Sequence, residues 1–162
     1  MNELTHIDDK GRVRMVDVTE KAPTARSAVA QAVIHMKEDT FKRILEGTLS
    51  KGNVLETARI AGVMAAKKTA DLIPMCHPLN LTHVQVDFFP DDASHSIRIE
   101  GQARIVDQTG IEMEALTAVS MAALTLYDMC KAVDKAMTIT DICLLKKTGG
   151  KSGAFLRDSD AS

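Results

Sequence analysis

His77 lies between two prolines, in the run Pro74-Met75-Cys76-His77-Pro78. Pro78 biases the backbone of His77 away from a helix, and Pro74 stiffens the approach to it. A histidine held in a rigid turn suits proton transfer or an oriented hydrogen bond. The same pattern fits a structural turn histidine beside a small thiol, and the residues alone leave both interpretations open. A zinc site is not indicated, because Cys76 and His77 have no second ligand pair nearby.

Two carboxylates, Glu112 and Glu114, open a predicted helix that begins two residues after Gly110. The helix dipole favours acidic side chains in a first turn, and this is the structural explanation for them. The functional explanation is that one carboxylate accepts the paired N–H groups of a guanine-like edge. Met113 would then supply a soft apolar wall for the ring.

Asp128 and Lys131 stand three residues apart on the same predicted helix and share one of its faces. On an open surface such an ion pair contributes little to stability. In a cleft, the carboxylate can orient or tune a lysine that acts as acid or base.

Three further lysines stand in settings that favour anions, although solvated lysines are the ordinary alternative. Lys51 precedes a predicted helix cap at Asn53, while Lys147 and Lys151 flank the glycines at 149 and 150. We expect this glycine segment to act as a flap that orders over phosphates.

The end of this segment imitates a phosphate-binding loop of the Walker A type. Gly150, Lys151 and Ser152 match its last three positions, but Leu145 stands where its first glycine belongs. No helix can follow so close to these residues. A P-loop ATPase is therefore rejected.

Glu114 and Asp128 are too far apart to hold one small ligand from the same helix. They are separated by fourteen residues, which is about 21 Å at the helical rise. Either the ligand is long or two copies of the chain build one pocket. We favour two copies, because the helices rich in alanine and glycine invite close packing between subunits.

The elements that must position these residues follow from hydrophobic periodicity. Strict alternation over residues 84–89 and 96–105 predicts two strands joined through residues 90–92. Further strands are expected at 13–18, 24–36 and 137–146, and helices at 39–45 (closed by Gly47), 53–72 and 112–133. The pattern predicts a single α+β domain over residues 1–162, with an antiparallel sheet, helices on one face and flexible ends at 1–12 and 156–162.

Composition excludes several classes of protein. Of the 162 residues, 45% are hydrophobic and 26% charged, the net charge is −2, and aromatic residues make up 3%. These values disfavour disorder and nucleic-acid binding by stacked bases. The three cysteines form no CxxC motif, so reduced thiols in the cytoplasm are expected. We expect neither a secretory signal nor a membrane-spanning segment.

Together the motifs resemble the cyclic pyranopterin monophosphate synthase family of molybdenum cofactor biosynthesis. They stand in family order and span about residues 5 to 155, nearly the whole chain. Met75 departs from the leucine that is frequent in the family, which is a volume-conserving exchange. The matching stretches cover residues 15–18, 51–54, 60–62, 74–79, 109–116, 127–131 and 147–152.

The resemblance implies a ferredoxin-like α+β fold and a homohexamer made of three dimers, with the active site at a subunit interface. It implies a lyase whose substrate is the 3′,8-cyclised dihydroguanosine triphosphate. The products would be cyclic pyranopterin monophosphate and pyrophosphate. No protein-held metal or cofactor is required, and whether Mg²⁺ accompanies the triphosphate stays open.

The resemblance also assigns roles to single residues. Asp128 matches the active-site residue of the family, Lys131 its acid/base partner, and Lys51 a group for proton transfer or phosphate contact. The remaining motif residues match substrate-binding positions. Among them, Glu112 would contact the base, and Lys147 and Lys151 would contact the triphosphate. The substrate-binding residues are Met75, Cys76, His77, Glu112, Met113, Glu114, Lys147 and Lys151.

Two other functions compete with this one. An oligomeric nucleotide sensor would use the same lysines and glutamates without turnover, and substitution of the Asp128–Lys131 pair would then be silent. An RNA-binding ferredoxin-like domain would need exposed aromatics at stacking positions. Phe88 and Phe89 are adjacent and face opposite sides of their strand, and the net charge also disfavours RNA.

Overall fold

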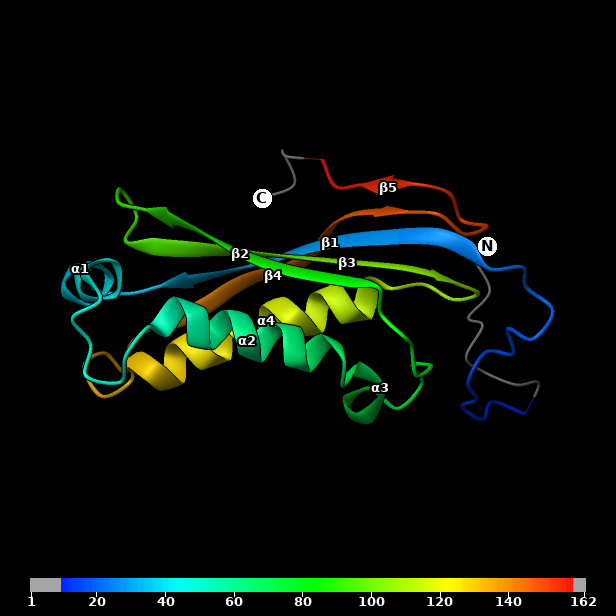
Figure 1. Cartoon of the computed structure of the whole chain (residues 1–162), viewed down its shortest axis with the longest axis horizontal. Coiled ribbons are helices and arrows are strands. Elements are labelled where there is room, and N and C mark those ends of the chain that lie inside the picture. Colours follow the sequence, from blue (N-terminus) through cyan, green and yellow to red (C-terminus); the bar gives the residue numbers. More distant parts are fainter. Residues whose placement is uncertain (1–9, 159–162) are drawn as a thin grey trace.

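Five strands form one antiparallel sheet in the computed structural model, which describes residues 10–158 (Figure 1). The order across the sheet is β2-β3-β1-β4-β5, so the first strand in sequence lies at the centre. The strands are β1 (Thr24–His35), β2 (His83–Asp91), β3 (Ser96–Asp107), β4 (Thr138–Thr148) and β5 (Phe155–Leu156).

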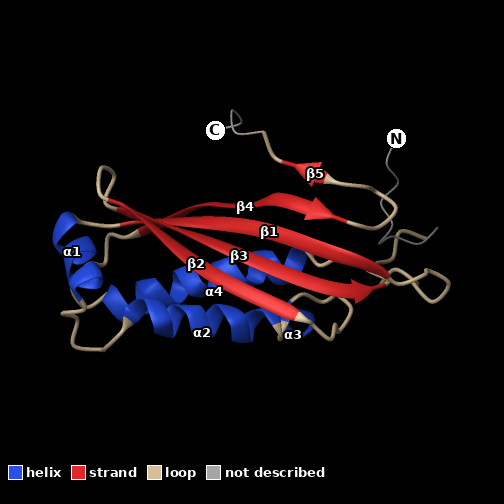
Figure 2. Ribbon diagram, turned by 45° about the horizontal axis from the view of Figure 1, so that its top comes forward, coloured by secondary structure: helices blue, strands red, loops and turns tan. Residues whose placement is uncertain are grey.

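Four helices of the described chain cover one face of this sheet (Figures 1 and 2). They are α1 (Glu38–Glu46), α2 (Val54–Ala66), α3 (Thr69–Leu72) and α4 (Glu112–Cys130). The long helix α4 lies against β1, β3 and β4, and α2 packs beside it over β2. The predicted α+β, ferredoxin-like architecture with helices on one face is confirmed.

Alternation along the strands places small and branched side chains under the helices. In β1 the residues from Ala28 to Ile34 are buried at every second position. At Gly62 of α2 an added Cβ would lie only 2.9 Å from the carbonyl oxygen of Ala118 in α4. The small residues of α2 therefore bring two helices of the same chain together, so they give no support for packing between subunits.

The expected strand over residues 13–18 is wrong. Only an isolated bridge at Val13 occurs there, and the rest of the segment is irregular. The carbonyl of Val18 accepts from Lys21, while the carboxylate of Asp17 accepts from both the amide and the hydroxyl of Thr19. These local hydrogen bonds take the place of a ladder.

The helix predicted from Asn53 to Leu72 is interrupted. Asn53 caps its start as expected, by accepting from the Glu56 amide at 3.1 Å. After Ala66 the backbone leaves the helical region at Lys68, and the Thr69 hydroxyl donates to the Ala66 carbonyl at 3.0 Å. A side chain that bonds to the backbone in this way competes with helix continuation.

Other boundaries shift, and one strand was missed. Helix α4 ends at Cys130 rather than 133, and Pro90 lies inside β2, where an edge strand tolerates its missing N–H. Leu156 belongs to β5 rather than to a loose tail, because Arg157 donates to two carbonyls of β4. Residues 1–9 and 159–162, also expected to be flexible, lie outside the described residues. Among the described residues no helix is long and apolar enough to cross a membrane.

Candidate active site

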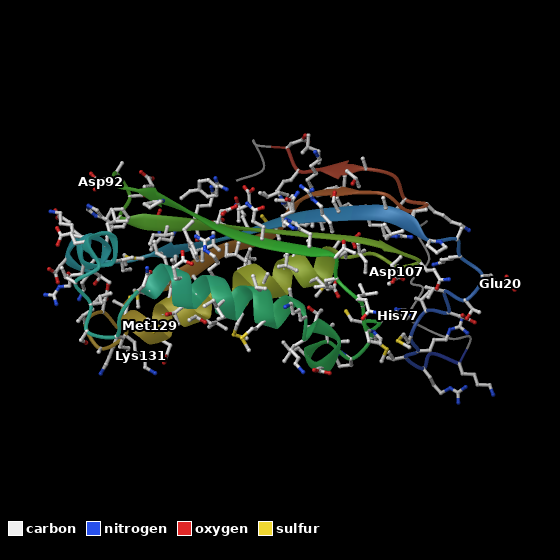
Figure 3. All side chains as sticks on the ribbon, in the orientation of Figure 1. Glu20, His77, Asp92, Asp107, Met129 and Lys131 are labelled. Carbon is white, nitrogen blue, oxygen red and sulfur yellow. The ribbon has the colours of Figure 1, made fainter. Side chains whose placement is uncertain are left out.

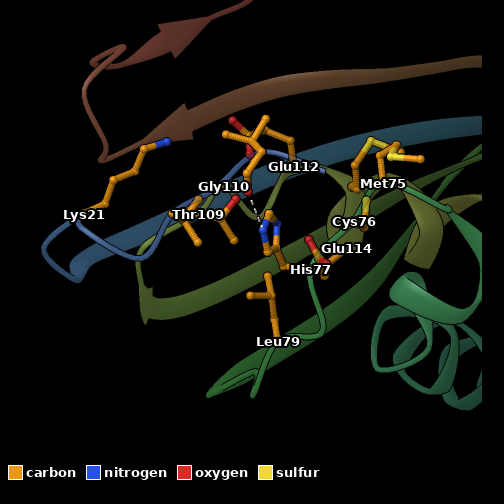
Figure 4. A pocket seen from close by; sticks show the side chains of 12 residues that line it. Lys21, Met75, Cys76, His77, Leu79, Thr109, Gly110, Glu112 and Glu114 are labelled. Atoms are coloured by element: carbon orange, nitrogen blue, oxygen red, sulfur yellow. Dashed lines mark hydrogen bonds between the residues drawn. The ribbon is translucent and has the colours of Figure 1, made fainter. Parts of the chain in front are cut away.

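The turn after α3, the first turn of α4 and residues 16–21 line a cavity of about 340 Å³ (Figure 4). Six of the eight residues that the sequence analysis assigned to substrate binding line this cavity. They are Met75, Cys76, His77, Glu112, Met113 and Glu114.

Glu114 is the buried acid of this cavity, with 3% of its surface exposed. The pKa of Glu114 is raised to about 7, chiefly by burial; a backbone hydrogen bond opposes this shift, and the nearby charge of Glu112 adds to it. Among the described residues no lysine or arginine forms an ion pair with Glu114. The carboxyl is therefore poised to hold or release a proton near neutral pH, or to pair with a ligand's N–H groups.

His77 and Cys76 face the same cavity with fixed roles. The His77 Nε2 lies 2.9 Å from the carbonyl oxygen of Val16, so this nitrogen donates. Burial, together with the charge of Glu114, raises the pKa of the Cys76 thiol above its ordinary value. Cys76 thus lines the cavity as a protonated, weakly polar thiol, and His77 lines it as an imidazole whose orientation is fixed by its hydrogen bond.

Lys51, Asp128 and Lys131 form a second cluster, at the far end of α4 from the cavity. The Lys131 ammonium lies 2.7 Å from one Asp128 oxygen, and the Lys51 ammonium lies 3.8 Å from the other and 3.0 Å from the Asp128 main-chain oxygen. Hydrogen bonding with Lys131 lowers the pKa of Asp128, and the same contact raises the pKa of Lys131.

This cluster is exposed in the single chain. The Asp128 and Lys131 side chains are 58% and 52% exposed. Figure 3 shows Lys131 and His77 at opposite ends of the helical layer. The structure therefore joins the three expected catalytic residues to one another but not to the cavity of the same chain.

A third group of basic side chains lies beside the cavity. Lys147 lies 3.7 Å from Glu112, which lines the cavity, and also contacts Ser152. Arg26, which the sequence analysis missed, donates to the main-chain oxygens of Asp107 and Gln108 at 2.9 Å each. The only sign of Arg26 in the sequence is that a charged residue stands near the start of an otherwise apolar strand.

Lys151 lines a neighbouring cavity of about 560 Å³ together with Lys21. Lys21 also lines the first cavity, so the two hollows adjoin at this side chain. Lys21 was not predicted from the sequence either, because a lysine in an irregular segment has no pattern around it. Lys21, Arg26, Lys147 and Lys151 gather four cationic side chains at this end of the molecule, beside the carboxylates of Asp17, Glu20 and Glu112.

The described residues contain no group of three or more histidine, cysteine, aspartate or glutamate side chains that could hold a metal ion. The side chains around the cavity and in the lysine cluster offer acid, base and cationic groups. These suit proton transfers and the stabilisation of phosphate charge.

Several known proteins are similar to this chain over nearly its whole length. A protein from Desulfatibacillum aliphaticivorans is 64% identical over 158 residues, which is 98% of this chain and 99% of the relative. A protein from Desulforapulum autotrophicum is 65% identical over 98% of this chain and 97% of the relative, and one from Heliobacterium modesticaldum is 55% identical over 98% and 99%. All three are named cyclic pyranopterin monophosphate synthase. The model of the MoaC family matches residues 15–150, which include the cavity, the lysine cluster and Lys147. The chain belongs to the MoaC family.

Proposed function

We propose that the chain is a cyclic pyranopterin monophosphate synthase of molybdenum cofactor biosynthesis, acting in the cytoplasm. Its substrate would be the 3′,8-cyclised dihydroguanosine triphosphate and its products cyclic pyranopterin monophosphate and pyrophosphate. The observation that carries this proposal is the cavity itself, where a buried acid adjoins a group of cations. The identity of full-length relatives with this name supports it.

The chemistry matches the groups at hand. Rebuilding the purine-derived ring needs several proton transfers but no redox change, and Glu114 offers a carboxyl that titrates near neutral pH. Closure of the cyclic phosphate needs an internal hydroxyl to attack the α-phosphorus. The new P–O bond forms as the bond to pyrophosphate breaks, which makes the enzyme a phosphorus–oxygen lyase. Lys147 and Lys151 neutralise the departing pyrophosphate, whose charge develops as it leaves.

The lysine cluster enters this scheme from a second chain. Within one chain Lys131 and Glu114 lie at opposite ends of α4, about 25 Å apart at the helical rise. A partner subunit that presents Lys51, Asp128 and Lys131 to this cavity would complete the site and shield the exposed ion pair from water. Asp128 would then orient Lys131 as the acid/base group, within a hexamer of three dimers.

Incubation of the purified protein with the cyclised dihydroguanosine triphosphate tests the proposal. Release of pyrophosphate and the mass of the pterin product, followed by mass spectrometry, should appear together. The Lys131→Ala variant is the matched control. Tight binding without any product would favour the nucleotide sensor instead.

A further inference from the structure

Asp134 is a carboxylate that the proposed chemistry does not use, yet its side chain is completely buried. One oxygen, Oδ2, accepts from the Lys37 amide at 2.9 Å and from the Thr40 hydroxyl at 3.4 Å. The other, Oδ1, accepts from the Ala136 amide at 3.0 Å. Hydrogen bonding from the Lys37 amide holds the pKa of Asp134 below its ordinary value, so the group is ionised at neutral pH.

The first contact places Asp134 at the start of α1. Lys37 is the N-cap residue of this helix and makes no side-chain capping bond of its own. A carboxylate at this position satisfies unpaired donors and meets the positive end of the helix dipole. Asp134 therefore serves as the cap of α1 although it comes from a distant part of the sequence.

The contact between Oδ1 and the Ala136 amide lies in the turn that follows α4, which further hydrogen bonds hold in place. This turn begins at Lys131, whose amide donates to the Tyr127 carbonyl at 2.8 Å, and it closes as the Asp134 amide donates to the Cys130 carbonyl at 3.1 Å. The Tyr127 hydroxyl donates to the main-chain oxygen of Lys135 at 3.2 Å. Lys131 is thus held between the last turn of α4 and the anchored carboxylate.

Lys51 is on the segment that follows α1, the helix whose start Asp134 contacts. It lies five residues after the end of α1, on the connection to α2, and its ammonium reaches Asp128. Figure 1 shows α1 and the turn after α4 at the same end of the molecule, where Figure 3 places Lys131. Asp134 therefore ties the turn that carries Lys131 to the start of α1, and the segment that carries Lys51 follows the end of the same helix.

We propose that Asp134 is a positioning residue, which holds the turn of Lys131 against α1 and so sets the arrangement of Lys51, Asp128 and Lys131. The inference rests on the proposed function, in which these three groups do the proton transfers. Asp134 touches no reacting atom and acts only through the two segments that it joins.

Two variants break the contact between Asp134 and the Lys37 amide, one from the side of the carboxylate and one from the side of the amide. Asp134→Asn keeps the size of the side chain but replaces one acceptor oxygen with an NH₂ group that faces a donor. Lys37→Pro keeps the carboxylate and removes the amide that donates to it, and the Lys37 backbone (φ −71°, ψ 151°) already suits proline. Lys37→Ala is the matched control, because it retains the amide and removes only the ammonium 3.9 Å from Asp134.

Steady-state kinetics and the pKa of the Lys131 ammonium, from NMR of lysine-labelled protein, give the readouts. We expect Asp134→Asn and Lys37→Pro to lower kcat by about ten- to a hundredfold, the size expected for a misplaced catalytic group, with KM within about twofold. The pKa of Lys131 should fall toward that of an ordinary lysine in both. Lys37→Ala should change neither quantity.

The inference would be overturned if Asp134→Asn and Lys37→Pro kept the wild-type kcat and the wild-type pKa of Lys131 and lowered only the melting temperature. If Asp134→Asn does not fold, Lys37→Pro decides the question in the same way. If the wild-type protein shows no turnover, the proposed function fails, and the pKa of Lys131 alone then judges whether Asp134 positions it.

Discussion

The imidazole of His77 donates from Nε2 to the main-chain carbonyl of Val16 at 2.9 Å, which ties the cavity to the segment that precedes β1. A carbonyl only accepts, so Nε2 carries the proton and Nδ1 remains for a ligand. We predict that neutral His77 is the Nε2–H tautomer in the free protein. The ¹⁵N shifts of the two ring nitrogens measure this directly, and a protonated Nδ1 beside a bare Nε2 would contradict it.

Glu114 should make the stability of the protein depend on pH. Its pKa is about 7 in the folded chain against 4.5 for an ordinary glutamate, so between these values the folded state binds more protons than the unfolded state. The free energy of unfolding should therefore fall as the pH rises from about 4.5 to about 7, by up to roughly 3 kcal/mol at 1.4 kcal/mol per pKa unit. Urea unfolding at several pH values measures it.

Glu114→Gln is the control for this dependence, because it keeps the shape of the side chain and removes the titration. The difference in unfolding free energy between wild type and variant should change across this pH window and level off above pH 7. Parallel pH profiles for the two proteins would show that another group titrates.

Lys131→Ala should abolish product formation while the substrate still binds. The ammonium pairs with Asp128 rather than with the cavity of its own chain, so its loss removes an acid/base group and leaves the cavity intact. Calorimetry should give a dissociation constant within about threefold of wild type, and mass spectrometry no product. Lys135→Ala, an exposed lysine in the same turn, is the control and should turn over normally. Product formation by Lys131→Ala would remove its catalytic assignment.

Periodicity predicted the parts of the fold that are regular. Strands β2 and β3 alternate strictly because one face of the sheet is buried, and Asn53 marks the start of α2 through a cap. The break at Lys68 and the irregular segment after Val13 escaped prediction, since local side-chain hydrogen bonds decide them. Strand β5 escaped as well, because it is short and depends on pairing with β4.

The residues of the cavity were predictable because they form two compact motifs, around His77 and Glu114. Asp128 and Lys131 are neighbours through helical spacing alone, whereas only tertiary structure brings Lys51, 77 residues away, to Asp128. Arg26 escaped for the same reason, since it acquires its setting from the glycine segment folded over it.

Gly150→Ala should weaken binding of the triphosphate. Gly150 has φ +76°, and a Cβ there would collide with the guanidinium of Arg26. Gly153→Ala is the matched control, since its φ is +69° and a Cβ would meet open space. Both changes impose a similar left-handed strain of about 1–2 kcal/mol, but only the first displaces Arg26. We expect KM to rise about tenfold or more in Gly150→Ala and to stay near wild type in Gly153→Ala. Equal KM values in the two variants would show that Arg26 does not take part in phosphate binding.

Mixed oligomers test whether two chains share one site. Glu114→Ala should disable the cavity of its own chain, and Lys131→Ala the cluster that its chain lends to a partner. When the two inactive variants are unfolded together and refolded at equal amounts, half of the symmetric dimers are mixed, and one of the two sites in each is intact. Activity should return to about a quarter of the wild-type value, as the two-fold symmetry of a shared site requires. Refolding each variant alone is the control and should give none. A refolded mixture that stays inactive, although mass spectrometry detects mixed oligomers, would show that each site is built from a single chain.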